Sequence, residues 1–240
     1  RYRMEGKKGK NKLTGETIEI IIIYFILFCG GLWHILGFFG NLMNVLGGFL
    51  MIAVSIYMVI KLLSYNFKES KVYFLKDNTK LTPLNPIIFS VLIIVITWLI
   101  EYIGVKTGKI FGHYEYGPAL LPQYNGVPLP IGFAWLSTFL SSLAIVKNKL
   151  KIINLTIIIF VVAVFMSTFD VFLEPAASKL YYWNWDKIFP PLQNYIAWFV
   201  ISILVGYAGR FFKVLHLRIP RSFQHIYLAQ IIYFFMVYFS

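Results

Sequence analysis

The stretch between Glu101 and Pro130 reads EYIGVKTGKIFGHYEYGPALLPQYNGVPLP. An apolar run of membrane length ends in its first residue, and a second apolar run begins at its last residues. A carboxylate is unfavourable near hydrocarbon, so Glu101 is a candidate functional residue. The segment between the two runs is rich in Gly, Tyr and Pro and has few charges. We therefore predict two membrane helices joined by a compact segment that begins beside an acid.

The composition extends this prediction to the whole chain. Of its 240 residues, 59% are hydrophobic and 13% are charged, and the mean hydropathy is +0.72. A soluble domain of this size could not bury that much apolar surface, which predicts an all-α polytopic membrane protein. A β-barrel would need short alternating strands, whereas these runs are continuous. The net charge of +12 lies between the runs, which favours membrane lipid over nucleic acid as its partner.

Seven apolar spans follow a basic segment at residues 1–17, so we expect a single seven-helix transmembrane domain over residues 18–240. Prolines open the third, fourth and sixth spans, where a missing N–H is tolerated. Pro175 is expected to end the fifth span at Glu174. The predicted spans are 18–38, 41–63, 86–105, 129–146, 152–174, 192–211 and 223–240.

The first two spans are joined by a very short turn near Gly40. We expect these spans to form a tight helical hairpin. Two glycine pairs, Gly30-Gly31 and Gly47-Gly48, would let the two helices approach closely.

Lys and Arg are unevenly distributed between the connections. With the N-terminus in the cytoplasm and alternating spans, 18 of the 22 basic residues lie on the cytoplasmic side and 4 lie opposite. Cytoplasmic connections of membrane proteins carry such an excess, and an even number of spans would destroy the pattern. We therefore predict a multi-pass protein of the cell (cytoplasmic) membrane with a cytoplasmic N-terminus.

The same topology gathers polar residues at the opposite, less basic face. Glu101 ends the third span, while Asp170 and Glu174 are four residues apart on one face of the fifth. His34 and Asn194 come from the first and sixth spans. The remaining candidates come from two connections and are Lys106, Tyr114, Tyr116, Trp183 and Trp185.

These residue types suit acid catalysis. Each acid lies at the negative end of a helix, near hydrocarbon and near other carboxyl groups, and all three factors disfavour an ionised carboxylate. A protonated carboxyl group can donate a proton, and each aromatic face can stabilise a cation by about 0.5–2 kcal/mol. This combination suits protonation of an unactivated alkene followed by capture of the carbocation by water. We see no metal-ligand spacing and no nucleotide motif, so no metal or cofactor is expected.

Structural roles are the alternative for several candidates. Glu101 could extend to the membrane interface, and Trp183 and Trp185 could belong to an interfacial aromatic belt. His34 could be a hydrogen-bonded histidine within the bundle. Asp170 and Glu174 are stronger candidates because two acids on one helix face rarely serve packing.

Several separated motifs stand out in the two halves of the chain. In the first half these motifs are EYIGVKTG at 101–108, Phe111-Gly112, Tyr114-Glu115-Tyr116 and Gly126-Val127-Pro128. In the second half they are Asp170, Glu174-Pro175-Ala176-Ala177, Trp183-Asn184-Trp185, Gln193-Asn194-Tyr195 and Trp198-Phe199. Together they resemble the membrane carotenoid biosynthesis proteins that include the carotenoid 1,2-hydratases, such as bisanhydrobacterioruberin hydratase and γ-carotene 1',2'-hydratase.

The resemblance implies a cofactor-independent hydro-lyase that adds water across the terminal C1–C2 double bond of an acyclic (ψ) carotenoid end group. One of the three acids would protonate the C2 side, with Asp170 as the first candidate because it should lie deepest. A neighbouring carboxylate or Asn194 would hold the water, and Lys106 would pair with Glu101 or with the Asp170/Glu174 pair. The implied partners are a lipophilic carotenoid and other carotenoid-pathway enzymes.

Two other classes of protein also fit seven spans with buried acids. One is a proton-coupled transporter, and the other is a non-enzymatic carotenoid-binding or structural protein. A transporter should have broken helices and polar groups near the middle of the membrane, whereas the polar groups here gather near one end.

Overall fold

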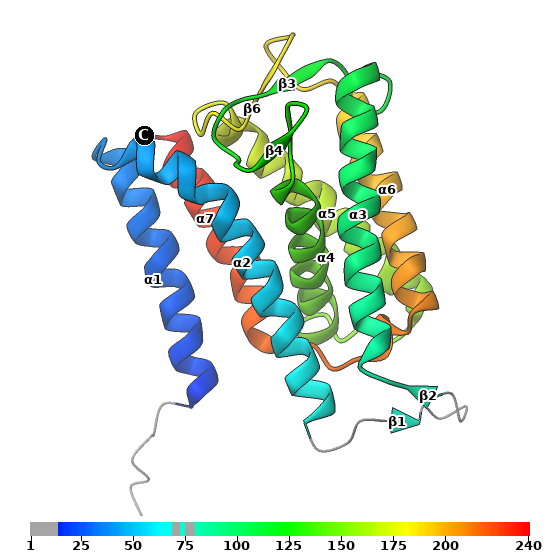
Figure 1. Cartoon of the computed structure of the whole chain (residues 1–240). Helices are drawn as coiled ribbons and strands as arrows, with labels where there is room; N and C mark the ends of the chain where they lie inside the picture. The colour runs from blue at the N-terminus through cyan, green and yellow to red at the C-terminus, as the bar shows by residue number, and fades with distance from the viewer. Residues whose placement is uncertain (1–13, 69–72, 75–79) are drawn as a thin grey trace, which may run out of the picture.

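The computed structural model describes residues 14–68, 73–74 and 80–240 (Figure 1). The predicted basic segment 1–17 therefore lies mostly outside the described residues. The helices are α1 (Gly15–Ile35), α2 (Gly40–Phe67), α3 (Leu84–Thr107), α4 (Pro130–Asn148), α5 (Leu155–Ala177), α6 (Leu192–Phe211), the 3-10 helix η1 (Val214–His216) and α7 (Arg221–Tyr238). The strands are β1 (Tyr73–Phe74), β2 (Lys80–Leu81), β3 (Tyr114–Tyr116), β4 (Gln123–Tyr124), β5 (Val127–Pro128) and β6 (Trp183–Trp185).

The helices confirm an all-α polytopic membrane protein. Within the described residues, six helices, α1 to α6, are long and apolar enough to span a membrane. The seventh, α7, is more polar, and its Ser222 and Gln224 are buried. It packs against α1, α4 and α5. The polar groups of α7 therefore face the interior of the bundle, where they avoid contact with lipid.

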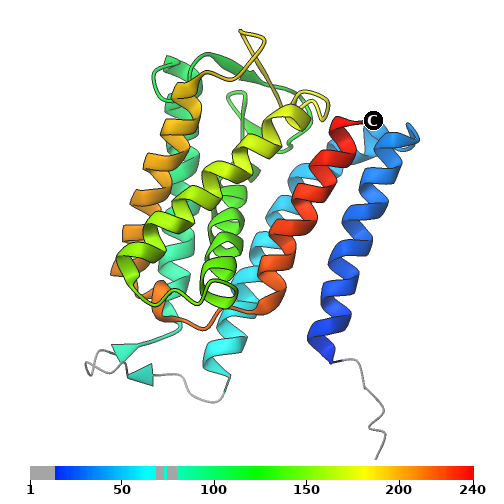
Figure 2. The same ribbon diagram turned by 180° about the vertical axis from the view of Figure 1, so that it is seen from behind.

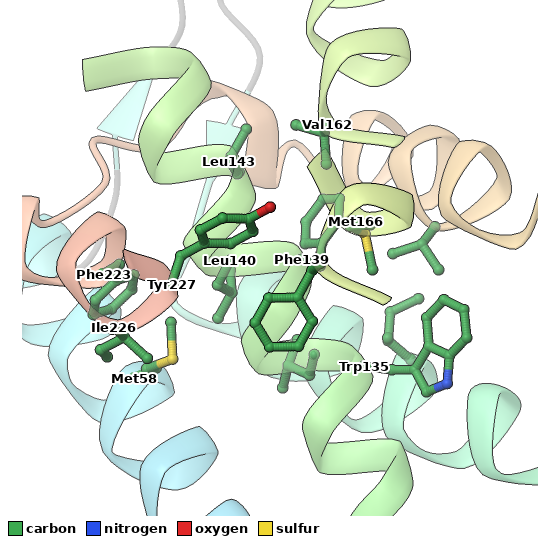
Figure 3. Packing of buried hydrophobic residues seen from close by; sticks show 14 of the residues in the cluster. Met58, Trp135, Phe139, Leu140, Leu143, Val162, Met166, Phe223, Ile226 and Tyr227 are labelled. Atoms are coloured by element: carbon green, nitrogen blue, oxygen red, sulfur yellow. The ribbon is translucent and has the colours of Figure 1, made fainter. Parts of the chain in front are cut away.

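Helix α4 forms the centre of the bundle and contacts α2, α3, α5 and α7. It is buried along most of its length, and small residues let its neighbours approach closely. At Gly132, for example, a side chain would collide with the backbone carbonyl of Ile94 in α3. Figure 3 shows the core around α4, with Trp135, Phe139, Leu140 and Leu143 from α4, Met58 from α2, Val162 and Met166 from α5, and Phe223, Ile226 and Tyr227 from α7.

The connections alternate between the two ends of the bundle (Figures 1 and 2). The α1–α2 turn and the connections carrying β3 to β6 lie at one end, which we call the charge-poor end. The α2–α3, α4–α5 and α6–α7 connections lie at the other end, where most of the basic residues that the structure describes fall. The elements that carry most of the predicted site residues therefore share one end of the bundle.

The prediction of a tight hairpin between the first two spans is wrong. The turn at residues 36–39 is short, but α1 and α2 diverge and α1 packs along α7 (Figure 2). Gly31 faces Met236 of α7, and Gly48 faces the backbone of Leu121 in the α3–α4 connection. Glycine pairs indicate a close approach, but they do not specify which neighbour approaches.

The predicted end of the fifth span at Glu174 is also wrong, because α5 continues through Pro175 to Ala177. A proline removes the N–H that would bond to the carbonyl four residues earlier. Here the loss affects only the last turn of α5. The side chain of Glu174 also accepts three hydrogen bonds, described below, which hold this turn in place.

Candidate active site

Two short strands from distant connections form an antiparallel pair at the charge-poor end. Strand β3 follows α3 and strand β6 follows α5, and Tyr114 lies opposite Trp185 while Tyr116 lies opposite Trp183. Because side chains alternate along a strand, these four aromatic residues share one face, and Glu115 belongs to the other. We call the β3–β6 pair the aromatic ribbon.

Strand β3 places two hydroxyl groups on Glu101 in the last turns of α3. Glu101 is buried, and its Oε2 accepts hydrogen bonds from the hydroxyls of Tyr114 (2.5 Å) and Tyr116 (2.9 Å). Its Oε1 accepts a third from Nε1 of Trp135 in α4 (2.9 Å). Burial, and then the nearby Glu101 carboxylate, raise the pKa of both tyrosine hydroxyls well above the ordinary value, so both stay neutral donors.

Strand β6 places two indoles on Glu174. Its Oε2 accepts hydrogen bonds from Nε1 of Trp183 (3.1 Å) and from Nε1 of Trp185 (2.8 Å). Its Oε1 accepts a third from the amide of Asn194 in the first turn of α6 (3.1 Å). All three partners are N–H donors.

Asp170 lies one turn before Glu174 and is completely buried. The amide of Asn194 also donates to Asp170 Oδ2 at 2.7 Å, so one amide group bridges the two acids. Asp170 Oδ1 is buried and has no hydrogen-bond partner among the described residues. An unpaired carboxyl oxygen is unfavourable in the interior of a protein, so this atom needs a function or a ligand to explain it.

The three acids line one small cavity with a volume of about 20 Å³. A cavity needs about 10–15 Å³ by this measure to hold a water molecule, so this one has room for a single water. The residues lining it come from four helices and two connections, and they are Glu101, Phe111, Tyr114, Tyr116, Ile131, Asp170, Glu174, Trp183, Trp185, Asn194 and Trp198. The structure thus brings eight of the ten predicted site residues together, and their roles stay predictions.

The other two predicted residues lie elsewhere. Nε2 of His34 in α1 lies 3.0 Å from the Tyr233 hydroxyl in α7, and His34 does not line the cavity. Lys106 donates to the carbonyl of Asn125 (3.2 Å), and it forms no ion pair with any of the three acids, all of which the structure describes. Lys106 is five residues after Glu101, so it projects from a different side of α3.

The sequence analysis missed Trp135, which binds Glu101. It also did not select Trp198, whose ring stacks on Trp135 with centroids 3.8 Å apart and an interplanar angle of 16°. A signal was present, because an indole N–H within an apolar span needs an acceptor. The sequence does not show which acid supplies that acceptor, since Trp135 and Glu101 lie in different helices.

Among the described residues, no group of three or more His, Cys, Asp or Glu side chains is arranged to hold a metal ion. The two acids bridged by Asn194, Asp170 and Glu174, both line the cavity. The cavity can therefore hold a proton and a small hydrogen-bonding molecule.

The fold and the site define a polytopic helical membrane protein with a buried, aromatic-lined group of acids near one end of the bundle. Residues 47–240 match the family model described as carotenoid biosynthesis protein, and the chain belongs to this family. The match begins within α2, so α1 lies outside it. Neither the curated proteins nor the solved structures contain a match to the chain.

Proposed function

We propose that this protein is a carotenoid hydratase that adds water across the C1–C2 double bond of an acyclic (ψ) end group. Membership of the carotenoid biosynthesis family supports a carotenoid substrate. The observation that carries the proposal is the buried, unpaired Oδ1 of Asp170, a residue that lines a water-sized cavity with aromatic walls. The reaction needs a proton donor, a surface that tolerates a cation, and a water.

The hydrogen bonds favour different roles for the two bridged acids. The partners of Glu174 are Trp183, Trp185 and Asn194, and an indole or amide N–H can only donate. Three such donors match an ionised carboxylate at Glu174. Asp170 receives one donor and keeps Oδ1 free to carry a proton. We therefore assign Asp170 as the acid and Glu174 as the anion facing the cation.

The reaction begins when Asp170 transfers its proton to C2, and the π electrons of the double bond form the new C–H bond. The positive charge then lies on the tertiary C1, where the Glu174 carboxylate and the aromatic faces stabilise it. The oxygen of water bonds to C1, and the resulting oxonium returns a proton to the Asp170 carboxylate. The product is a tertiary alcohol, and Asp170 recovers its starting state.

The end group is larger than the cavity, so its binding requires the walls to move. The aromatic ribbon is the wall best suited to this movement, because its strands are short and belong to connections. Four hydrogen bonds from the ribbon to the two glutamates hold it closed. Closing again over the bound end group would exclude bulk water from the carbocation.

The unequal distribution of Lys and Arg supports a cytoplasmic N-terminus in the cell membrane. In this orientation the charge-poor end lies near the outer leaflet. The cavity lined by the three acids, which we call the acid cavity, lies there too. A carotenoid is dissolved in the membrane, so its end group could reach the cavity without leaving the lipid.

The test is expression of the full chain in cells that accumulate lycopene or γ-carotene, followed by mass spectrometry of the extracted carotenoids. We expect a product heavier by one water, and Asp170→Asn should lower its rate by about 10²–10⁴-fold, the usual contribution of a general acid. The control is Glu115→Gln, which changes an exposed acid on the other face of the ribbon. It should leave the rate unchanged.

Two results would contradict the proposal. One is the absence of a hydrated product with either carotenoid when the protein is present in the membrane. The other is full activity of Asp170→Asn. Carotenoid binding without any product would instead support a non-enzymatic carotenoid-binding protein.

A further inference from the structure

The size of the acid cavity has a consequence for the nucleophile, if the protein is the hydratase proposed above. Its volume of about 20 Å³ accommodates one water and leaves little room for an additional methyl group. A buried water typically makes about three hydrogen bonds. Asp170 and Glu174 line the cavity, and their carboxyl groups can take part in these hydrogen bonds.

The apolar part of the wall determines how much larger a bound molecule could be. Ile131, in the first turn of α4, is the one aliphatic residue among those that line the cavity, and it is buried. Both Ile131 and Asp170 belong to helices of the bundle and not to the aromatic ribbon. This side of the cavity therefore keeps its shape when the ribbon moves to admit the end group.

We propose that the cavity is the binding site of the water that attacks the carbocation, and that Ile131 makes this site selective for water over alcohols. The polar wall would accept any small hydroxylic molecule, because methanol also offers an O–H donor and an oxygen acceptor. Only the steric boundary distinguishes the two. Shortening Ile131 to alanine removes three carbon atoms from that boundary and leaves the acids unchanged.

The reaction with methanol balances in the same way as the reaction with water. Asp170 gives its proton to C2, the methanol oxygen bonds to C1, and the oxonium returns its proton to the Asp170 carboxylate. The product is a tertiary methyl ether in place of a tertiary alcohol. The ratio of ether to alcohol therefore reports the nucleophile in the cavity and is independent of the overall rate.

The experiment uses isolated membranes containing the full chain and the carotenoid, with methanol added to the buffer. A hydrophobic site distinguishes molecules that differ by one methylene by about 10–200-fold, so the wild type should form almost only the alcohol. Ile131→Ala should raise the ether-to-alcohol ratio by about tenfold or more, and Ile131→Val should raise it less. The matched control is Ile145→Ala, the same truncation at a buried position near the other end of α4. This control should keep the wild-type ratio.

The inference is overturned if the wild type forms ether in proportion to the methanol present. It is also overturned if both Ile131 variants keep the wild-type ratio, or if Ile145→Ala raises the ratio as much as Ile131→Ala does. If Ile131→Ala fails to fold, the ether-to-alcohol ratio of Ile131→Val tests the inference: a raised ratio supports it and the wild-type ratio overturns it. Failure of the proposed hydratase function is a different result, because the wild type would then form no alcohol in buffer without methanol.

Discussion

Glu101 and Glu174 are both buried glutamates that accept three hydrogen bonds, yet their surroundings differ in kind. Strand β3 supplies two hydroxyls to Glu101, and strand β6 supplies two indoles to Glu174. The third partner of Glu101 is an indole that binds it alone. The third partner of Glu174 is an amide shared with a second acid, Asp170.

Under the proposed mechanism, this difference separates a group that positions the site from groups that act in it. Both oxygens of Glu101 are paired, and its partners hold β3 against α3 and α4. The bridged pair includes an oxygen, Asp170 Oδ1, with no partner among the described residues. Burial does not distinguish the two clusters, since all three acids are buried. The unpaired oxygen does distinguish them, because it can exchange a proton without first breaking a hydrogen bond.

The sharpest test of this comparison is Glu174→Gln. The change removes the negative charge that, in the proposed mechanism, faces the carbocation, and it can place an amide N–H against the indole N–H donors of Trp183 and Trp185. Loss of one preorganised electrostatic group typically lowers kcat by about 10²–10³-fold, and we expect a loss of that size. The measurement is the initial rate of alcohol formation per amount of protein in the membrane. Wild-type activity in this variant would remove the assigned role of Glu174.

A smaller effect on the rate is expected for Glu101→Gln. Glutamine keeps one acceptor oxygen but can place its amide N–H against the donors from β3, so the ribbon should be held less firmly. A buried unsatisfied group costs about 1–3 kcal/mol, which should appear mainly as lower thermal stability. The measurements are the melting temperature in detergent and the rate of alcohol formation. If Glu101→Gln loses as much activity as Glu174→Gln, then Glu101 acts in the chemistry and the comparison is wrong.

The smallest effect is expected for Trp135→Phe. Phenylalanine keeps an aromatic ring against Trp198 and removes the hydrogen bond to Glu101. The change leaves the buried Oε1 of Glu101 without this donor, which costs at least about 1 kcal/mol. For a chain of this size, that energy lowers the melting temperature by about 2–4 °C. An unchanged melting temperature would show that this hydrogen bond adds nothing to the stability of the Glu101 cluster.

The comparison also shows how much of the site could be predicted. Asp170 and Glu174 were recognisable together because four residues of helix place them on one face. The motif Tyr114-Glu115-Tyr116 and the motif Trp183-Asn184-Trp185 each repeat an aromatic residue at the period of a strand. Their pairing into one ribbon was not predictable, because the two motifs lie in different connections. Lys106 was misplaced because nearness in the chain to Glu101 was taken as nearness in space.

The sequence by itself determined the seven helices, their approximate limits and the concentration of basic residues in alternate connections. These properties depend on hydrophobic length and charge, which are local along the chain. Only the tertiary structure decided that α1 packs along α7, that Trp135 binds Glu101 and that one amide, Asn194, bridges Asp170 and Glu174. Each of these contacts joins residues from different helices. Such contacts depend on how whole helices fit together, and a pattern within one helix does not specify its neighbour.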